Sequence, residues 1–126
     1  MLSEAVMCLS LAIYHEARGE PIVGQMAVAE VVMNRVAHPR WANEVCKVIK
    51  RKAQFAFYWD GKSDEMKDSI AREIATAIAE SYIHIGNPGI VLGATCYTTK
   101  VVDNYWTRNS PVVITIGSHK FLDCGK

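Results

Sequence analysis

Residues 3–21 read SEAVMCLSLAIYHEARGEP, and this stretch decides how the rest of the chain is interpreted. The run from Ala5 to Ile13 is almost entirely apolar, which predicts a helix buried on most sides rather than an amphipathic surface helix. Ser3 is suited to cap the start of this helix. We expect the helix to run to about Ala17 and to stop near Gly19, a residue that favours helix ends.

Glu16 lies near the end of this predicted helix, inside a short polar cluster. A carboxyl group carried out of an apolar wall is partly desolvated, and desolvation favours its protonated form. A general acid requires that form, so Glu16 is our candidate catalytic residue. The structural alternative is that Glu16 only pairs with Arg18 or caps the next helix.

Composition limits the classes of protein to consider. The chain has 126 residues, of which 50% are hydrophobic and 21% charged, and its formal net charge is +1. These values predict a single domain over residues 1–126, with no bulk electrostatic field that would draw it to nucleic acid. The apolar start is short and lacks a basic leader, so we expect neither a signal peptide nor a membrane span. We also expect a monomer.

Helical signals continue after the first helix. Pro21 suits the first turn of a second helix that ends before Pro39, and Asn43 is positioned to cap a short third helix. We expect residues 53–62 to form an aromatic-rich loop and Ser63 after it to cap the longest helix. Apolar residues at helical spacing on that helix predict a core-facing stripe of Met66, Ile70, Ile74, Ile78, Tyr82 and Ile85.

The pattern changes after Pro88 to short β-rich runs at 90–92, 95–99 and 112–116. A helical body that carries a small antiparallel sheet is an α+β fold. We expect a substrate cleft between the two parts.

Four cysteines lie far apart, without a CxxC pair, and three have mainly apolar neighbours. We interpret them as buried thiols rather than disulfides, with Cys124 exposed in a polar tail. The four are Cys8, Cys46, Cys96 and Cys124.

Several short blocks occur in an order that suggests a family. They are residues 16–21 (EARGEP), Gly24-Gln25, 27–29 (AVA), Asn34-Arg35, Gln54-Phe55, Trp106, Ile116-Gly117 and 119–121 (HKF). Over about residues 12 to 122 the chain resembles the SleB-type cell-wall hydrolases, which include spore-cortex-lytic enzymes and some phage endolysins. The resemblance implies a lysozyme-like domain that cuts the glycan strands of peptidoglycan, with Glu16 as its catalytic acid.

The expected chemistry is cleavage of the β-1,4 bond between N-acetylmuramic acid and N-acetylglucosamine. A lytic transglycosylase needs one carboxylate, whereas a hydrolytic muramidase needs a second. Glu20 is the nearby candidate, but we expect it to brace Arg18 and the helix start, so a transglycosylase is favoured. Substrate contacts are predicted for Gln54, Tyr97, Trp106 and His119.

Two other functions remain open at this point, and a third is rejected. Cys96 and His119 could form a peptidase or amidase pair that acts on the stem peptide. His15-Glu16 resembles the opening of the HExxH zinc motif, but Gly19 stands where the second histidine is needed, so neither a metal nor another cofactor is expected. A non-catalytic wall-binding module would explain the aromatic loop only.

We therefore expect action on the bacterial cell wall. Without a signal peptide, the chain would reach the wall by phage-type release through a holin, by another export route, or as a domain excised from a longer secreted protein.

Overall fold

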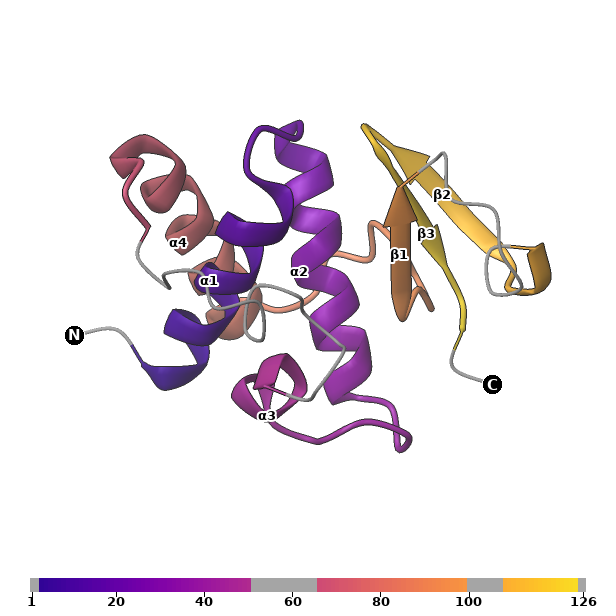
Figure 1. Ribbon diagram of the computed structural model, residues 1–126. Helices are drawn as coiled ribbons and strands as arrows, with labels where there is room; N and C mark the ends of the chain where they lie inside the picture. The colour runs from indigo at the N-terminus through magenta and orange to yellow at the C-terminus, as the bar shows by residue number, and fades with distance from the viewer. Residues whose placement is uncertain (1–2, 51–65, 100–107, 125–126) are drawn as a thin grey trace.

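Four helices and a three-stranded sheet make up the fold (Figure 1). The structure is a computed structural model, and it describes residues 3–50, 66–99 and 108–124. Its elements are α1 (Glu4–Ala17), α2 (Ile22–Val36), α3 (Val45–Lys50), α4 (Ser69–His84), β1 (Cys96–Thr99), β2 (Val112–Ile116) and β3 (His119–Leu122). In Figure 1, α2 stands between the other helices and the sheet.

The first two helices begin and end where the sequence predicts. The Ser3 side chain accepts a hydrogen bond of 3.2 Å from the backbone N–H of Val6, which caps α1. Gly19 has a φ of 89°, a conformation that glycine adopts without a steric penalty, and Pro21 then precedes α2. The turn between these helices is therefore encoded locally.

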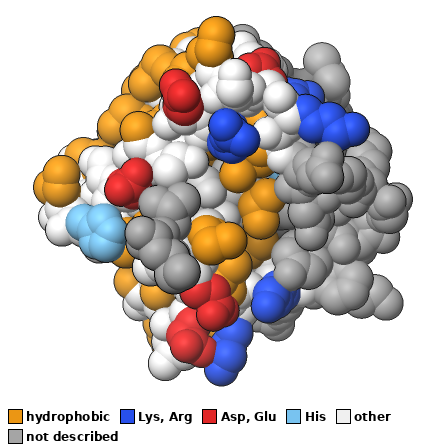
Figure 2. Space-filling view, turned by 90° about the vertical axis from the view of Figure 1, so that its left-hand side faces the viewer, with side chains coloured by type: hydrophobic (Ala, Val, Ile, Leu, Met, Phe, Trp, Pro, Cys, Tyr) orange, Lys and Arg blue, Asp and Glu red, His pale blue; other side chains and the backbone are white. Residues whose placement is uncertain are grey.

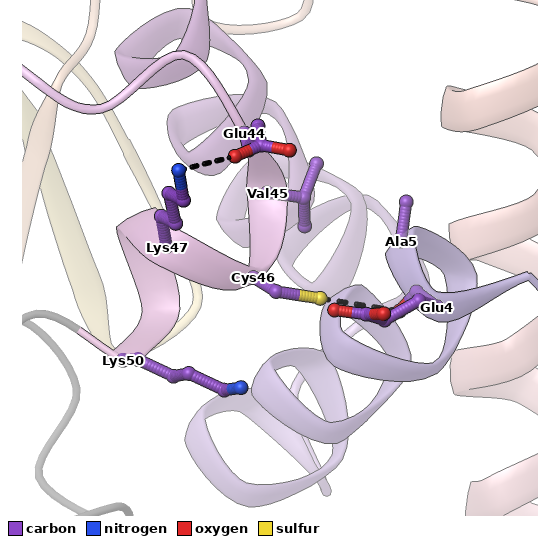
Figure 3. A pocket seen from close by; sticks show the side chains of 7 residues that line it. All are labelled: Glu4, Ala5, Glu44, Val45, Cys46, Lys47 and Lys50. Atoms are coloured by element: carbon purple, nitrogen blue, oxygen red, sulfur yellow. Dashed lines mark hydrogen bonds and ion pairs between the residues drawn. The ribbon is translucent and has the colours of Figure 1, made fainter.

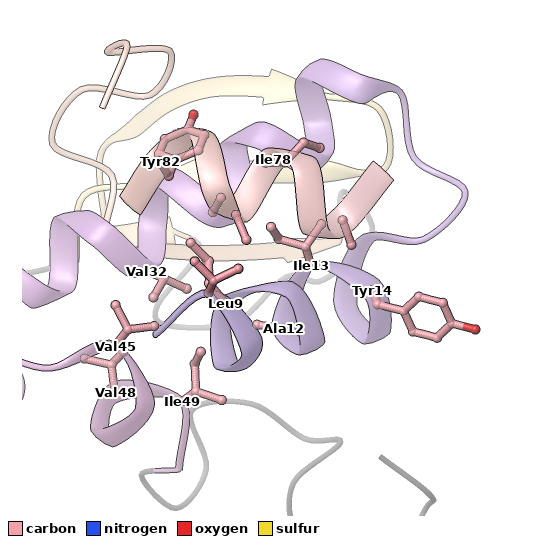
Figure 4. Packing of buried hydrophobic residues seen from close by; sticks show 14 residues of the cluster. Leu9, Ala12, Ile13, Tyr14, Val32, Val45, Val48, Ile49, Ile78 and Tyr82 are labelled. Atoms are coloured by element: carbon pink, nitrogen blue, oxygen red, sulfur yellow. The ribbon is translucent and has the colours of Figure 1, made fainter. Parts of the chain in front are cut away.

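The core of the helical part surrounds α1, which packs against α2, α3 and α4 (Figure 4). Leu9 and Ile13 have no exposed surface, and Val32, Val48 and Tyr82 reach the same cluster from the other three helices. The expectation that the first helix is buried on most sides is confirmed.

The start of α4 differs from the prediction. Residues 66–68 are not helical, and the cap is Asp68, whose side chain accepts a 3.1 Å hydrogen bond from the N–H of Ala71. Ile78 belongs to the core as expected, but Ile70 is 70% exposed and Ile85 is 84% exposed. These two lie in the first turn and at the C-cap, at the ends of the helix rather than in its packed middle.

The sheet has the antiparallel order β1-β3-β2, with Tyr97 opposite Phe121 and Ile116 opposite His119. The predicted strand at 90–92 is wrong, because these residues form a turn closed by a 3.0 Å hydrogen bond from Ala94 N–H to the Val91 carbonyl. The third strand is instead β3.

A second apolar cluster joins the sheet to the helices. Phe121, with no exposed surface, packs in this cluster with Ala27, Val28 and Val31 of α2 and with Ala17 at the end of α1. The α+β expectation is confirmed, since one small antiparallel sheet lies against a mainly helical body.

Both pairs of cysteines form disulfides, so the expectation of buried thiols is wrong. Cys8 of α1 is bonded to Cys46 of α3, with Cα atoms 5.3 Å apart, and Cys96 of β1 is bonded to Cys124, with Cα atoms 5.9 Å apart. Cys124 is only 8% exposed, against the prediction of an exposed tail. Apolar neighbours suit a buried thiol and a buried disulfide equally, and only folding brings the partners to bonding distance.

Candidate active site

Glu16 lies in the last turn of α1, where the two apolar clusters meet. Ile13, one turn earlier, belongs to the helical core, whereas Ala17 belongs to the cluster shared with the sheet. Glu16 itself is half-buried. Its carboxylate is therefore placed at the junction of helices and sheet, where the sequence predicts a cleft.

Tyr97 of β1 meets Glu16 at this junction. Its hydroxyl donates a 2.7 Å hydrogen bond to Glu16 Oε1 across 81 residues of sequence. In the described part of the chain, no other hydrogen bond to the Glu16 carboxylate is found. Oε2 therefore has no hydrogen-bond partner among the described residues.

The hydroxyl of Tyr97 stays protonated at this position. Burial raises the pKa of Tyr97 well above its ordinary value of 10.0, and the negative charge and hydrogen bond of Glu16 raise it further. The Arg35 cation opposes the shift only in part. Tyr97 is thus a constant hydrogen-bond donor to Glu16 over the physiological pH range.

His119 packs on the other side of the Tyr97 ring. The two ring centroids are 5.1 Å apart with an interplanar angle of 70°, an edge-to-face contact. The buried Nδ1 of His119 has no hydrogen-bond partner within the described residues, and Glu20 Oε1 lies 3.9 Å from it. The predicted site residues Glu16, Tyr97 and His119 thus form one continuous group.

Glu20 has a different partner from the one predicted. Its Oε1 accepts a 2.8 Å hydrogen bond from Ser118 N–H, and its Oε2 accepts one of 2.6 Å from the Ser118 hydroxyl. Arg18 instead donates from Nη1 to the hydroxyl of Tyr14, and its guanidinium carbon lies 4.5 Å from the centroid of that ring. Glu20 therefore joins the α1–α2 turn to the β2–β3 turn rather than bracing Arg18.

Polar residues of α2 hold the segment that leads into β1. Glu30 has no exposed surface, and its carboxylate accepts hydrogen bonds from Tyr82 OH at 3.0 Å, Ile90 N–H at 3.0 Å and Val91 N–H at 2.6 Å. One turn later, Asn34 Nδ2 donates to the carbonyls of Val91 and Ala94 at 3.2 and 2.8 Å.

Arg35 continues this support. Its Nε donates a 2.6 Å hydrogen bond to the carbonyl of Thr95, the residue before β1. Sequence reasoning assigned no role to Glu30, Asn34 or Arg35. The signal in the sequence was a glutamate and an asparagine four residues apart on a mainly apolar helix, a spacing that puts both side chains on one helix face.

The thiol alternative is excluded by the Cys96–Cys124 disulfide, because a thiolate is required for nucleophilic attack and Cys96 has none to offer. The described ranges contain no cluster of three or more His, Cys, Asp or Glu side chains arranged to hold a metal ion. Within the same ranges, no helix has the length and apolar character needed to cross a bilayer. Gln54 and Trp106 lie outside the described residues.

A surface pocket lies at the other end of α1 from Glu16 (Figure 3). Its walls come from the start of α1 and from α3, and include the exposed ion pair between Glu44 and Lys47, 2.7 Å long. Glu4 in its wall is about 18 Å along the helix from Glu16 at 1.5 Å per residue. This pocket is therefore separate from the candidate active site.

Comparison with known proteins identifies the family. A family model described as Cell Wall Hydrolase matches residues 19–122, a stretch that begins just after Glu16. The chain belongs to this cell wall hydrolase family. The resemblance suggested by the sequence blocks is confirmed.

Curated relatives of this family member are spore cortex-lytic enzymes. The enzyme of Halalkalibacterium halodurans is 32% identical over 119 residues, which cover 94% of this chain and 34% of the relative. The enzyme of Bacillus subtilis is 31% identical over 124 residues, covering 94% of this chain and 37% of the relative. The chain thus spans little more than a third of the length of these relatives.

Two solved catalytic domains share the fold. The catalytic domain of the Bacillus cereus SleB protein is 28% identical with a TM-score of 0.72, and the match covers 97% of this chain and 92% of that domain. The catalytic domain of the germination-specific lytic transglycosylase SleB from Bacillus anthracis is 28% identical with a TM-score of 0.76, and covers 96% of each chain. The lysozyme-like expectation is confirmed at the level of the fold.

Proposed function

We propose that this cell wall hydrolase cleaves the β-1,4 bond between N-acetylmuramic acid and N-acetylglucosamine in peptidoglycan, with Glu16 as general acid. The observation that carries the proposal is the 2.7 Å hydrogen bond from Tyr97 to Glu16 Oε1, made where the last turn of a buried helix meets the sheet. It holds one carboxylate oxygen and leaves the other for the glycosidic oxygen.

In the first step, protonated Glu16 delivers its proton to the glycosidic oxygen. The bond from that oxygen to the muramic anomeric carbon breaks, its electron pair leaves with N-acetylglucosamine, and positive charge develops at the anomeric carbon. Glu16 becomes a carboxylate in this step. The Tyr97 hydroxyl then donates to a charged acceptor, and such a bond is roughly twice as strong as a neutral one.

In the second step, the C6 hydroxyl of the same muramic sugar attacks the anomeric carbon. Its proton goes to the Glu16 carboxylate, which restores the acid and leaves a 1,6-anhydro end. No water is consumed, so one carboxylate serves both steps. This product defines a lytic transglycosylase.

The state of Glu20 supports the transglycosylase over the hydrolytic muramidase. A muramidase needs a second carboxylate to activate water or to attack the sugar. Both oxygens of Glu20 accept hydrogen bonds from Ser118, which occupies the carboxylate in a structural role. The Bacillus anthracis relative is described as a lytic transglycosylase, in agreement with this choice.

The disulfides support action outside the cytoplasm, on the bacterial cell wall. Disulfides form and persist in oxidising compartments and are rare in the cytosol. All four cysteines of the chain are paired. The formal net charge is +1, and acidic and basic side chains are interspersed over the described part of the face shown in Figure 2, which is not the single-sign field expected of a nucleic-acid binder.

The test is mass spectrometry of soluble fragments released from purified peptidoglycan. We expect 1,6-anhydro-muramic ends with the wild type and none with Glu16→Gln, which keeps the shape of the side chain but has no proton to deliver. Glu73→Gln, an exposed carboxylate change on α4, is the matched control and should leave the products unchanged.

Other outcomes separate the alternatives. Reducing muramic ends that depend on Glu16 would establish a hydrolytic muramidase. Wild-type protein that binds peptidoglycan without cutting it would indicate a wall-binding module and refute the enzymatic proposal. Fragment release that Glu16→Gln leaves intact would remove Glu16 from the mechanism.

A further inference from the structure

We infer that Glu20 is a positioning residue, which together with Ser118 fastens the β2–β3 turn to the end of the helix that carries Glu16 and thereby sets Tyr97 against Glu16. This inference rests on the proposed function of Glu16. It assigns Glu20 neither the role of a second catalytic carboxylate nor that of a brace for Arg18.

We call the contact between Glu20 and Ser118 the clamp, because two hydrogen bonds join these residues. Glu20 accepts from the N–H of Ser118 at 2.8 Å with one oxygen and from its hydroxyl at 2.6 Å with the other, across 98 residues of sequence. The Glu20 side chain is only 17% exposed, whereas Ser118 lies at the surface, so the bonds are open to water on the Ser118 side. Hydrogen bonds to a carboxylate are the strong class, and two of them fix both the position and the orientation of the turn.

The turn is fitted closely to this carboxylate. Gly117 has a φ of 56°, which favours glycine, and a Cβ at that position would collide with Glu20 Oε1 and would lie 3.1 Å from Pro21 Cδ. Nearby, a Cβ on Gly24 of α2 would meet Ile116 of β2 at 3.5 Å. The backbone of the β2–β3 turn therefore lies directly on the α1–α2 turn.

The clamp reaches Tyr97 through His119, the residue after Ser118 and the first of β3. The His119 ring lies edge-on to Tyr97, with centroids 5.1 Å apart, and Phe121 opposite Tyr97 has its centroid 5.9 Å away. His119 Nδ1 also lies 3.9 Å from Glu20 Oε1, so Glu20 faces this ring directly as well as holding the residue before it. If Glu20 no longer held the β2–β3 turn, the rings of His119 and Tyr97 would be able to shift.

Two polar contacts join the end of α1 and the turn after it to the sheet. Glu16 and Glu20 flank the same turn, so the α1–α2 connection contacts the sheet twice, once through Tyr97 and once through Ser118. Loss of the second contact leaves the first to the 2.7 Å hydrogen bond and to the apolar packing of Tyr97 and Phe121 against the helices, which is less directional than a hydrogen bond. A misplacement of about 1 Å at a catalytic group can cost as much as 10²-fold in rate.

The experiment combines glycan-cleavage kinetics with an NMR signal from Tyr97 in protein labelled with [13Cζ]tyrosine, assigned by the loss of that signal in Tyr97→Phe. Glu20→Ala should lower kcat by up to about 10²-fold with little change in KM. Ser118→Ala, which keeps the backbone N–H contact, should cause a smaller loss, and Ser118→Thr should restore the rate. The Tyr97 signal should move in both alanine variants.

Double substitution and a surface control complete the design. Because Ser118 acts only through Glu20, Glu20→Ala with Ser118→Ala should be no slower than Glu20→Ala alone. Glu73→Ala, on the exposed face of α4, should change neither kcat nor the Tyr97 signal. If Glu20→Ala fails to fold, the same test is made by comparing kcat and the Tyr97 signal of Ser118→Ala with those of Ser118→Thr.

Two results would overturn the inference. An unmoved Tyr97 signal and an unchanged kcat, with only a lower melting temperature, would make the clamp purely structural. A complete loss of activity in Glu20→Ala, with Ser118→Ala fully active and the Tyr97 signal in place, would make Glu20 a chemical participant. Failure of wild-type protein to cut glycan would refute the proposed function alone, since the Tyr97 signal tests the clamp without turnover.

Discussion

Tyr97→Phe tests the link between the sheet and the candidate acid most directly. The substitution removes only the hydroxyl that donates 2.7 Å to Glu16 Oε1 and keeps the ring that packs against His119 and Phe121. Because burial holds the pKa of Tyr97 well above 10.0, the wild-type hydroxyl is a donor at every pH used in an assay. The comparison is therefore between one hydrogen bond and none.

The size of the effect follows from how this bond changes during the reaction. Before proton delivery the acceptor is a neutral carboxyl, and a neutral hydrogen bond contributes about 0.5 to 1.5 kcal/mol. After delivery the acceptor is charged, and the contribution is about 1.5 to 3 kcal/mol. Only the difference, about 1 to 2 kcal/mol, accelerates the reaction, so kcat should fall about 5- to 30-fold in Tyr97→Phe.

Tyr82→Phe is the matched control. Tyr82 also donates a hydrogen bond to a carboxylate, at 3.0 Å to Glu30 Oε1, but Glu30 binds the backbone N–H groups of Ile90 and Val91 rather than Glu16. We expect Tyr82→Phe to lower the free energy of unfolding by about 1.5 to 3 kcal/mol and to leave kcat unchanged well below the melting temperature.

Steady-state release of soluble fragments from peptidoglycan, with melting curves for both variants, provides the measurement. If Tyr97→Phe keeps kcat within twofold of wild type, the hydrogen bond does not stabilise the transition state and the reasoning is refuted. If KM rises while kcat stays constant, Tyr97 contributes substrate binding, as the sequence suggests, rather than support for the acid.

Two further predictions concern stability. Replacing Cys96 and Cys124 together by serine removes a cross-link between residues 28 positions apart, which should lower the free energy of unfolding by about 3.6 kcal/mol. Urea titrations at neutral pH measure this change, and an unchanged midpoint would contradict the prediction. Burial, as the first cause, raises the pKa of both Tyr82 and Tyr97 above 10.0, so their stabilising effect is complete below pH 10. Above that pH the tyrosines of the unfolded chain ionise first, so each of the two should lower the free energy of unfolding by about 1.4 kcal/mol per pH unit. In urea titrations between pH 9 and 11, Tyr82→Phe should halve the part of this pH dependence that comes from the two tyrosines.

Much of the helical part could be predicted because its signals act over one helical turn. Ser3 caps Val6, Gly19 adopts a positive φ and Pro21 precedes α2, and each effect depends on residues at most a few positions away. The same locality explains one error. Ile70 has the helical spacing of a core residue but is 70% exposed, because spacing does not show where the partner helix ends.

The sheet was harder to predict because strand pairing is decided by distant residues. The run at 90–92 has the composition of a strand but forms a turn, since Glu30 and Asn34 bind its backbone groups from α2. Residues 119–122 form the central strand, paired on both sides, although their composition is unremarkable for a strand.

The sequence by itself determined the order of the helices, the identity of the candidate acid and the family, because caps, periodicity and ordered motif blocks are all read along the chain. Only the tertiary structure decided that the cysteines are paired, that Tyr97 donates to Glu16 and that Glu20 holds Ser118. These contacts join residues far apart in sequence, up to 98 positions for Glu20 and Ser118. Such pairs are specified by the packing of α1 and α2 against the sheet, and no local pattern encodes that packing.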